Sequence, residues 1–166
     1  GWISVNSHKY YSDSEGKITT GFLELGDNKY YFNTNGIMQT GVIAIDSSYY
    51  GFNNEGLMLT GLQNISGGKY YFKEDGKAYK GWLSIDNTNY YFDLNYAYAL
   101  TGFQVIDNNK YYFNGDGAKV VGWLTLNSNK YHFAEDGIMT IGWYKDENLN
   151  EYYFNKNGIM SLGLST

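Results

Sequence analysis

Apolar and polar positions repeat along the chain with a period of about twenty residues. Each unit opens with a glycine, alternates apolar and polar side chains, crosses a short Asp/Asn/Ser/Gly segment and reaches an aromatic triplet such as Tyr30-Tyr31-Phe32. Two short alternating runs around a turn segment are typical of a β-hairpin. The opening glycines are Gly1, Gly21, Gly41, Gly61, Gly81, Gly102, Gly122 and Gly142. The sequence therefore predicts eight hairpins, with a partial ninth unit starting at Gly163.

A second turn is expected after each aromatic triplet. Seven units have a glycine fifteen or sixteen residues after their start, where it supplies a positive φ: Gly16, Gly36, Gly56, Gly76, Gly117, Gly137 and Gly158. The fifth unit has Asn95 and Tyr96 at this place, and asparagine is the next most tolerant residue for that conformation. This unit, like the eighth, is one residue longer than the rest, and we expect an altered backbone at its turn. The eighth carries its extra residue in the loop 146–150.

Period-two alternation assigns the faces of each hairpin. The fourth residue after the glycine, such as Ile106, is predicted to face inward, and the first, such as Phe103, to face the other way. The phenylalanine of each triplet shares a face with the tyrosine two residues before it. Because a lone hairpin is marginal in water, these faces must pack on neighbouring units or on a ligand. We therefore predict an all-β solenoid of stacked β-hairpins, forming a single elongated domain over 1–166.

Composition narrows the classes of partner. Nineteen tyrosines, nine phenylalanines and four tryptophans suit thin cores and ring-lined binding surfaces. A net charge of -5 without a basic stripe argues against nucleic acid and anionic lipid as partners. No apolar run is long enough to span a bilayer, and the absence of cysteine excludes disulfides and thiolate metal sites. The chain opens inside a repeat, so we expect it to be a fragment of a larger protein. We also expect that it is monomeric and that the parent protein is secreted or held at the bacterial cell surface.

The sequence offers no catalytic or metal-binding motif. His8 and His132 are isolated histidines without carboxylate or cysteine partners in register, and the Asp/Asn clusters fit turn chemistry better than calcium loops. No nucleophile motif surrounds any serine. We therefore expect no enzyme activity, no cofactor and no metal.

The motifs Gly-Trp/Phe-x-x-Ile, Asp-Asn-Asn-Lys-Tyr-Tyr-Phe and Asp-Gly-Ile-Met resemble the bacterial cell-wall-binding repeat superfamily. This superfamily includes choline-binding modules of autolysins, glucan-binding regions of glucansucrases and the combined repetitive oligopeptides of large clostridial toxins. The toxin repeats are the most similar, through Lys29, Lys69 and Lys110 before the triplet, the segment 105–113 and the variant Ala97-Tyr98-Ala99. The resemblance implies a left-handed solenoid of hairpins and a receptor-binding region that recognises carbohydrate.

The choline-binding branch differs at one position. Its modules place tryptophan just before the Tyr-Tyr pair, where the ring helps to wall a cage for a quaternary ammonium. That position is lysine in five units here, at Lys9, Lys29, Lys69, Lys110 and Lys130. A lysine has the wrong charge for a cationic ligand, so choline binding is disfavoured, although Tyr49 keeps an aromatic ring there.

Three functions remain open: a multivalent carbohydrate-binding region like that of a toxin, a cell-wall anchoring module that holds teichoic acid, choline or glucan, and a structural stalk. The partners expected are cell-surface glycans or wall polymers. The candidate carbohydrate-binding residues pair outward rings with neighbouring rings or polar groups: Trp82 with Tyr91, Trp123 with Tyr112, Trp143 with His132, and Lys110 and Lys130 as donors. Packing between units is the alternative role of these tryptophans.

Overall fold

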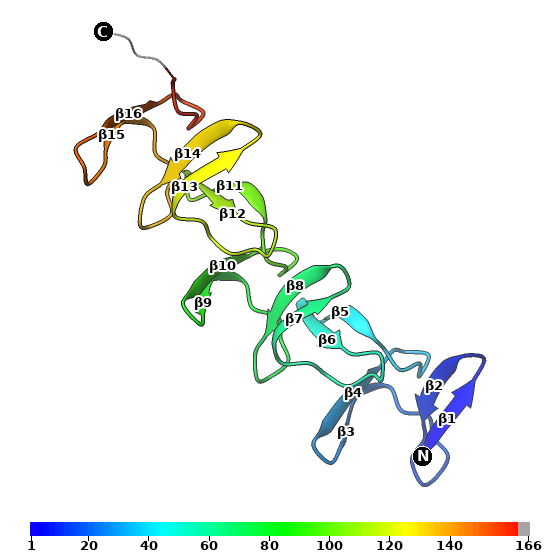
Figure 1. Ribbon diagram of the computed structural model, residues 1–166. Coiled ribbons are helices and arrows are strands. Elements are labelled where there is room, and N and C mark those ends of the chain that lie inside the picture. The colour runs from blue at the N-terminus through cyan, green and yellow to red at the C-terminus, as the bar shows by residue number, and fades with distance from the viewer. Residues whose placement is uncertain (163–166) are drawn as a thin grey trace. The chain divides into compact units, whose positions relative to one another are not determined.

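The computed structural model describes residues 1–162, so the expected ninth unit from Gly163 lies outside the described residues. The fold is all-β, with antiparallel two-stranded hairpins repeated about every 20 residues, as predicted (Figure 1). None of the described residues forms a helix that could cross a membrane. The strands are β1 (Trp2–Val5), β2 (His8–Tyr11), β3 (Gly21–Leu25), β4 (Asn28–Phe32), β5 (Gly41–Ile45), β6 (Ser48–Phe52), β7 (Gly61–Ile65), β8 (Gly68–Phe72), β9 (Gly81–Ile85), β10 (Thr88–Phe92), β11 (Gly102–Ile106), β12 (Asn109–Phe113), β13 (Gly122–Leu126), β14 (Asn129–Phe133), β15 (Gly142–Lys145) and β16 (Glu151–Phe154).

The hairpins gather into two compact units. The first contains Gly1–Gly81 together with Phe92–Ala99, and the second contains Trp82–Tyr91 and the chain from Leu100 onward. Each unit therefore holds several successive hairpins, and the packing below is described within one unit at a time.

Within residues 1–162, seven of the eight hairpins are closed by a two-residue turn whose chemistry is visible in the sequence. In β11 and β12 the register pairs Gly102 with Phe113, Phe103 with Tyr112 and Ile106 with Asn109. The two linking residues, Asp107 and Asn108, both have positive φ values of 49° and 65°. This is a type I′ turn, which matches the right-handed twist of the strands and favours Asp and Asn.

The predicted inner face of the hairpins is confirmed. The phenylalanine that ends each triplet is buried in seven hairpins, at Phe32, Phe52, Phe72, Phe92, Phe113, Phe133 and Phe154. Ile106 and Tyr111 are buried beside Phe113, whereas Phe103, one residue after the opening glycine, stays 46% exposed. Each phenylalanine therefore anchors its own small core, and the outward rings remain accessible.

Successive repeats are tied by backbone hydrogen bonds of constant register. In each case the donor is the N–H of the residue two positions after the turn glycine. The acceptor is a carbonyl in the preceding repeat, that of the residue just before its Tyr-Tyr pair. Thus Met38 donates to Lys9 in the first unit, and Met139 donates to Lys110 in the second, each at 2.8 Å. This bond fixes each turn segment against the hairpin of the preceding repeat.

The second turn has its predicted glycine in positive φ, between 74° and 87°, in the seven units that carry one. The fifth unit differs from the expectation. Ala97, with φ 64°, adopts the left-handed conformation in place of Asn95 or Tyr96. The inserted residue widens this turn, since Ala97 donates its N–H to Asp93 four residues back, whereas Gly117 donates to Asn114 three residues back.

Candidate binding site

In five of the described hairpins the aromatic residue after the opening glycine lies between a ring of its own hairpin and a ring of the next; these residues are Trp2, Phe22, Trp82, Phe103 and Trp123. Trp82 meets Tyr91 of its own hairpin edge to face, with ring centroids 5.0 Å apart, and Tyr111 of the next hairpin at 5.1 Å. We call such a set, formed by the outward ring, the middle ring of its hairpin and the first ring of the next triplet, an aromatic corner. The Trp82 corner consists of Trp82, Tyr91 and Tyr111.

Two further tryptophans form equivalent corners. The Trp2 corner has Tyr11 at 5.4 Å and Tyr30 at 5.0 Å. The Trp123 corner has His132 at 5.1 Å and Tyr152 at 4.9 Å. The neighbouring rings meet the indoles steeply, so a large part of each indole stays accessible. The π face of tryptophan carries negative potential and attracts cations.

One corner already holds an ammonium group that belongs to the chain. Lys119 Nζ lies over the Trp82 ring, 5.5 Å from the centroid, and donates a hydrogen bond of 2.7 Å to the carbonyl of Asp136. This distance lies within the range of cation–π attraction. An aromatic corner of this geometry therefore accepts a primary ammonium.

Lys119 occupies a repeat position that is methionine in four other units. The equivalent residues are Met38, Met58, Met139 and Met160. A Cβ built on Gly137 would lie 2.7 Å from the Lys119 side chain, and one built on Gly158 would lie 2.4 Å from that of Met139. The two side chains thus cross the turn glycine of the next repeat in the same way. The Trp2 and Trp123 corners have methionine where the Trp82 corner has its lysine.

The structure brings together one of the three predicted pairs of rings. Trp82 and Tyr91 are in contact, but Trp123 contacts His132 instead of Tyr112, and Trp143 contacts Tyr153, at 5.3 Å, instead of His132. Tyr112 contacts Phe103, its cross-strand partner, at 4.9 Å. In all three hairpins the outward ring meets the middle ring of its own hairpin.

The two predicted lysine donors lie on β12 and β14. Lys110 lines a hollow of about 200 Å³ together with Phe103, Gln104, Tyr131 and Asn157. Lys130 precedes Tyr131, and its backbone carbonyl accepts the N–H of Met160 at 2.8 Å. Lys110 therefore lines a ring-walled hollow, whereas the contact described for Lys130 is made by its backbone.

The sequence analysis did not single out the Trp2 corner, and at the other two corners it missed Tyr111, Tyr152 and the neighbouring Lys119. The two tyrosines belong to the hairpin after the tryptophan, and the alternation within one unit does not show which ring of the next unit it meets. Lys119 carried a visible signal, since it is the lysine in a column where four units have methionine.

The Trp123 corner contains a buried histidine, His132. Its ring is 7% exposed, stacks on Tyr144 with centroids 4.0 Å apart and has the Thr140 hydroxyl 2.8 Å from Nδ1. Burial lowers the pKa of His132 below its usual value of about 6.5. The neutral imidazole is therefore the form that the folded chain favours.

We expect the stability contributed by neutral His132 to be complete above about pH 6.5 and to be lost as the pH falls towards the lowered pKa. The unfolded chain binds the proton more readily in this window. Melting temperatures measured from pH 7.5 to 5.5 should fall more steeply for the wild type than for His132→Tyr. The exposed His8→Gln is the control and should keep the wild-type slope. Equal slopes for wild type and His132→Tyr would contradict the assignment.

The comparison with protein families agrees with this geometry. The choline-binding repeat family matches residues 59–95, 100–126 and 120–162, and a cell wall binding repeat family matches residues 1–18 and 20–38. The first match covers more than half of the chain, which therefore belongs to the choline-binding repeat family. A comparison with curated protein sequences found no match.

Three similar solved structures come from Streptococcus pneumoniae. CbpJ is 29% identical with a TM-score of 0.77, and the alignment covers 95% of this chain and 57% of CbpJ. Choline binding protein F is 28% identical with a TM-score of 0.74, and the alignment covers 95% of this chain and 57% of that protein. The choline-binding domain of CbpL is 25% identical with a TM-score of 0.62, covering 97% and 86%. The chain thus spans just over half the length of CbpJ and CbpF.

These comparisons place the chain among choline-binding and cell-wall-binding repeat modules. They support the cell-wall alternative better than the resemblance to toxin repeats, for which they give no support. Among residues 1–162, no group of three or more histidine, aspartate or glutamate side chains is placed to hold a metal ion.

Proposed function

We propose that this chain is a non-catalytic module that attaches its parent protein to the bacterial cell wall by holding quaternary ammonium groups of a wall polymer. The binding sites are the Trp2 and Trp123 corners. Each offers a tryptophan face bounded by two further rings, and neither has a lysine at the position of Lys119. Two sites on one chain would bind a polymer more tightly than either site alone.

The observation that carries this proposal is the Lys119 ammonium over Trp82, 5.5 Å from the ring centroid. It is an internal ligand with the charge that the other corners would take from outside. A trimethylammonium group is less strongly hydrated than a primary ammonium, which favours its transfer onto an aromatic surface.

The lysines before the Tyr-Tyr pairs are compatible with cation binding where their charge is balanced. Lys29 pairs with Glu24 across its hairpin, with Nζ and Oε1 2.7 Å apart. In the eighth hairpin the equivalent residue is Glu151, which pairs with Lys145 at 2.9 Å. The repulsion that the sequence suggested is therefore reduced in these hairpins.

A second candidate function is carbohydrate binding, favoured by the hollow beside Phe103. Its walls combine the rings of Phe103 and Tyr131 with the polar side chains of Gln104, Lys110 and Asn157. Rings suit the apolar face of a sugar, and polar groups suit its hydroxyls. A glycan array would test this candidate, and loss of the signal in Phe103→Ala would assign it to this hollow. If the chain bound only host glycans on the array, a toxin-like receptor-binding role would be favoured.

The cell-wall proposal is tested by titrating choline into the intact chain and into Trp2→Ala, Trp123→Ala and the double variant. We expect millimolar affinity per site, equivalent to about 4 kcal/mol. Calorimetry should show two sites in the wild type, one in each single variant and none in the double variant. Circular dichroism verifies that each variant is folded.

Trp143→Ala is the matched control, because Trp143 contacts Tyr153 of its own hairpin and no next hairpin lies within the described residues. Choline binding should be unchanged in this variant. If the folded wild type shows no saturable binding of choline, wall polymers or glycans, the structural stalk becomes the better interpretation. Location at the bacterial cell surface follows from the proposed attachment.

A further inference from the structure

The fourth repeat departs from its neighbours at the turn after β8. Lys73 stands where other repeats place Asn33, Asn53 or Asn114, whose side chains accept hydrogen bonds from the turn backbone. Lys77 stands where most repeats have an apolar residue such as Ile37 and the first has Lys17, and Lys80 replaces a threonine such as Thr40. Three of the twelve lysines of an acidic chain are thus gathered within eight residues of one repeat.

These three lysines face a common hollow. A cavity of about 390 Å³ is lined by Lys73, Lys77 and Lys80 together with Ser47 and Ser48 from the turn of the third hairpin. The backbones of Lys77 and Tyr50 form an isolated antiparallel β-bridge, and Ala78 donates its N–H to the carbonyl of Tyr49 at 2.8 Å. The turn is therefore fixed against the hairpin that supplies the hydroxyls.

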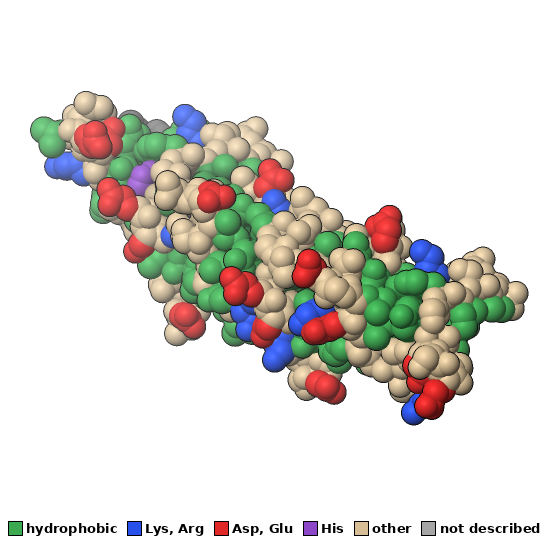
Figure 2. Space-filling view, turned by 90° about the horizontal axis from the view of Figure 1, so that it is seen from below, with side chains coloured by type: hydrophobic (Ala, Val, Ile, Leu, Met, Phe, Trp, Pro, Cys, Tyr) green, Lys and Arg blue, Asp and Glu red, His purple; other side chains and the backbone are tan. Residues whose placement is uncertain are grey.

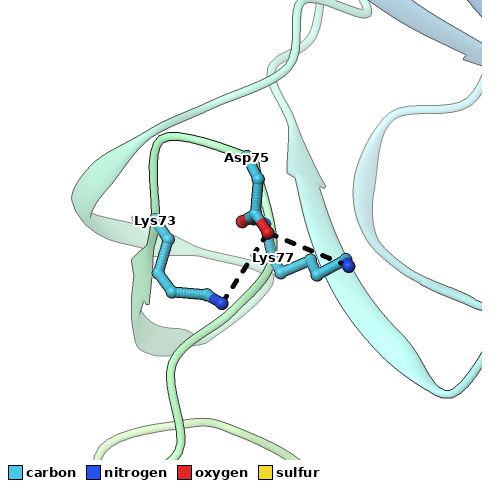
Figure 3. A network of polar contacts seen from close by, with 3 residues as sticks. All are labelled: Lys73, Asp75 and Lys77. Carbon is cyan, nitrogen blue, oxygen red and sulfur yellow. Dashed lines mark hydrogen bonds and ion pairs between the residues drawn. The ribbon is translucent and has the colours of Figure 1, made fainter.

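Asp75 leaves most of this positive charge available. Its Oδ2 lies 3.7 Å from Lys73 Nζ and 3.8 Å from Lys77 Nζ, so one carboxylate is shared between two ammonium groups at long distances (Figure 3). Figure 3 shows the two lysines approaching Asp75 from opposite sides. Lys80 does not take part and has its Nζ 5.8 Å from the centroid of the Tyr49 ring. Three ammonium groups thus line the hollow, and Asp75 is shared by two of them.

The same hollow is unsuited to a cationic ligand. Tyr49 is the aromatic residue at the position that is lysine in five other repeats, and the Lys80 ammonium already lies over its ring. At the repeat position that is methionine in four other repeats, this repeat has the smaller Ala78, which leaves room beside the lysines.

We propose that this hollow, the lysine pocket of Ser47, Ser48, Lys73, Lys77 and Lys80, binds a phosphate group. The three ammonium groups supply charge, and the two hydroxyls donate to phosphate oxygens that lysine leaves unsatisfied. The group comes either from free phosphate or from a phosphodiester of a polymer. This site is separate from the aromatic corners and does not depend on cation binding there.

The proposal is tested by titrating inorganic phosphate into the chain and following backbone amides by NMR. Amides of residues 46–49 and 73–80 should shift and saturate. In the variant Lys73→Gln/Lys77→Gln/Lys80→Gln the affinity should fall at least about tenfold. Asp75→Asn removes the competing carboxylate and should strengthen binding. A titration with poly(glycerol phosphate) distinguishes the two sources. If the polymer binds more tightly than inorganic phosphate, and this binding is lost in the same triple variant, the ligand is a polymer. If the two affinities are equal, the ligand is free phosphate.

The matched control is Lys9→Gln/Lys130→Gln/Lys156→Gln, which makes the same change in net charge in three separate repeats. Its phosphate affinity should equal that of the wild type. The proposal is overturned if the wild type shows no saturable shifts, or if the control variant loses as much affinity as the lysine-pocket variant. Choline titrations of the folded lysine-pocket variant should give wild-type values.

Discussion

Replacing Phe113 with alanine should lower the free energy of unfolding by about 3 to 5 kcal/mol. The side chain is 0% exposed and forms a core cluster with Ile106 and Tyr111. Its ring also lies 5.9 Å from Trp82 of the preceding hairpin. Truncation removes buried apolar surface and leaves a cavity that two hairpins share, so both contribute to the loss.

Urea unfolding followed by tyrosine and tryptophan fluorescence measures this effect. Lys110→Ala is the control on the same strand, since its exposed side chain should change stability by less than about 0.5 kcal/mol. A loss of similar size in the two variants would mean that the inward and outward faces of β12 are wrongly assigned.

Replacing Lys119 with methionine should create a third choline site. The variant removes the ammonium from the Trp82 corner and installs the residue that Met38 and Met160 provide at the Trp2 and Trp123 corners. Methionine fits because Met139 already crosses Gly158 as Lys119 crosses Gly137. Calorimetric stoichiometry should rise from two choline molecules per chain to three. The new site should have the millimolar affinity of the others, equivalent to about 4 kcal/mol.

Lys156→Met is the matched control, since it makes the same chemical change on an exposed turn. It should leave the stoichiometry at two. If folded Lys119→Met also binds two, the lysine is a packing residue and the Trp82 corner is not a cation site. Trp82→Ala in the Lys119→Met background should return the count to two.

The sequence was sufficient for the hairpins because their determinants are local. Alternation placed Phe113 and Tyr111 on one face and Phe103 on the other, and each of these follows from the residues of one repeat. The turn of the fifth repeat was harder to predict. Asparagine's tolerance of positive φ favoured Asn95, but the inserted residue shifted that conformation to Ala97. Spacing within the turn outweighed residue preference there.

The candidate site was less predictable because it lies between repeats. Trp123 was paired with Tyr112 of the preceding hairpin, whereas its corner is completed by Tyr152 of the following one. Periodicity gives the order of the repeats but not the rotation between neighbours, and that rotation decides which rings meet. Charge was equally ambiguous, since the lysines before the Tyr-Tyr pairs suggested repulsion of cations, while Glu24 pairs with one of them.

Charged side chains of both signs are scattered over the face seen in Figure 2, with hydrophobic side chains between them. The lysine pocket is therefore not visible in the total charge of -5 or in a search for long basic runs. It becomes visible when the eight units are compared position by position, because three columns change to lysine in the same repeat.

The constant register between repeats has an evolutionary consequence. The backbone bonds from Met38 to Lys9 and from Met139 to Lys110 join neighbouring repeats, with the acceptor about thirty residues before the donor. Recombination that duplicates or deletes one whole repeat would recreate the same junction on both sides. The number of binding sites can then change by genetic slippage without redesign of the fold. If the proposed function is correct, a single residue in each repeat, lysine at position 119 and methionine at positions 38 and 160, would decide whether a corner is open to a ligand.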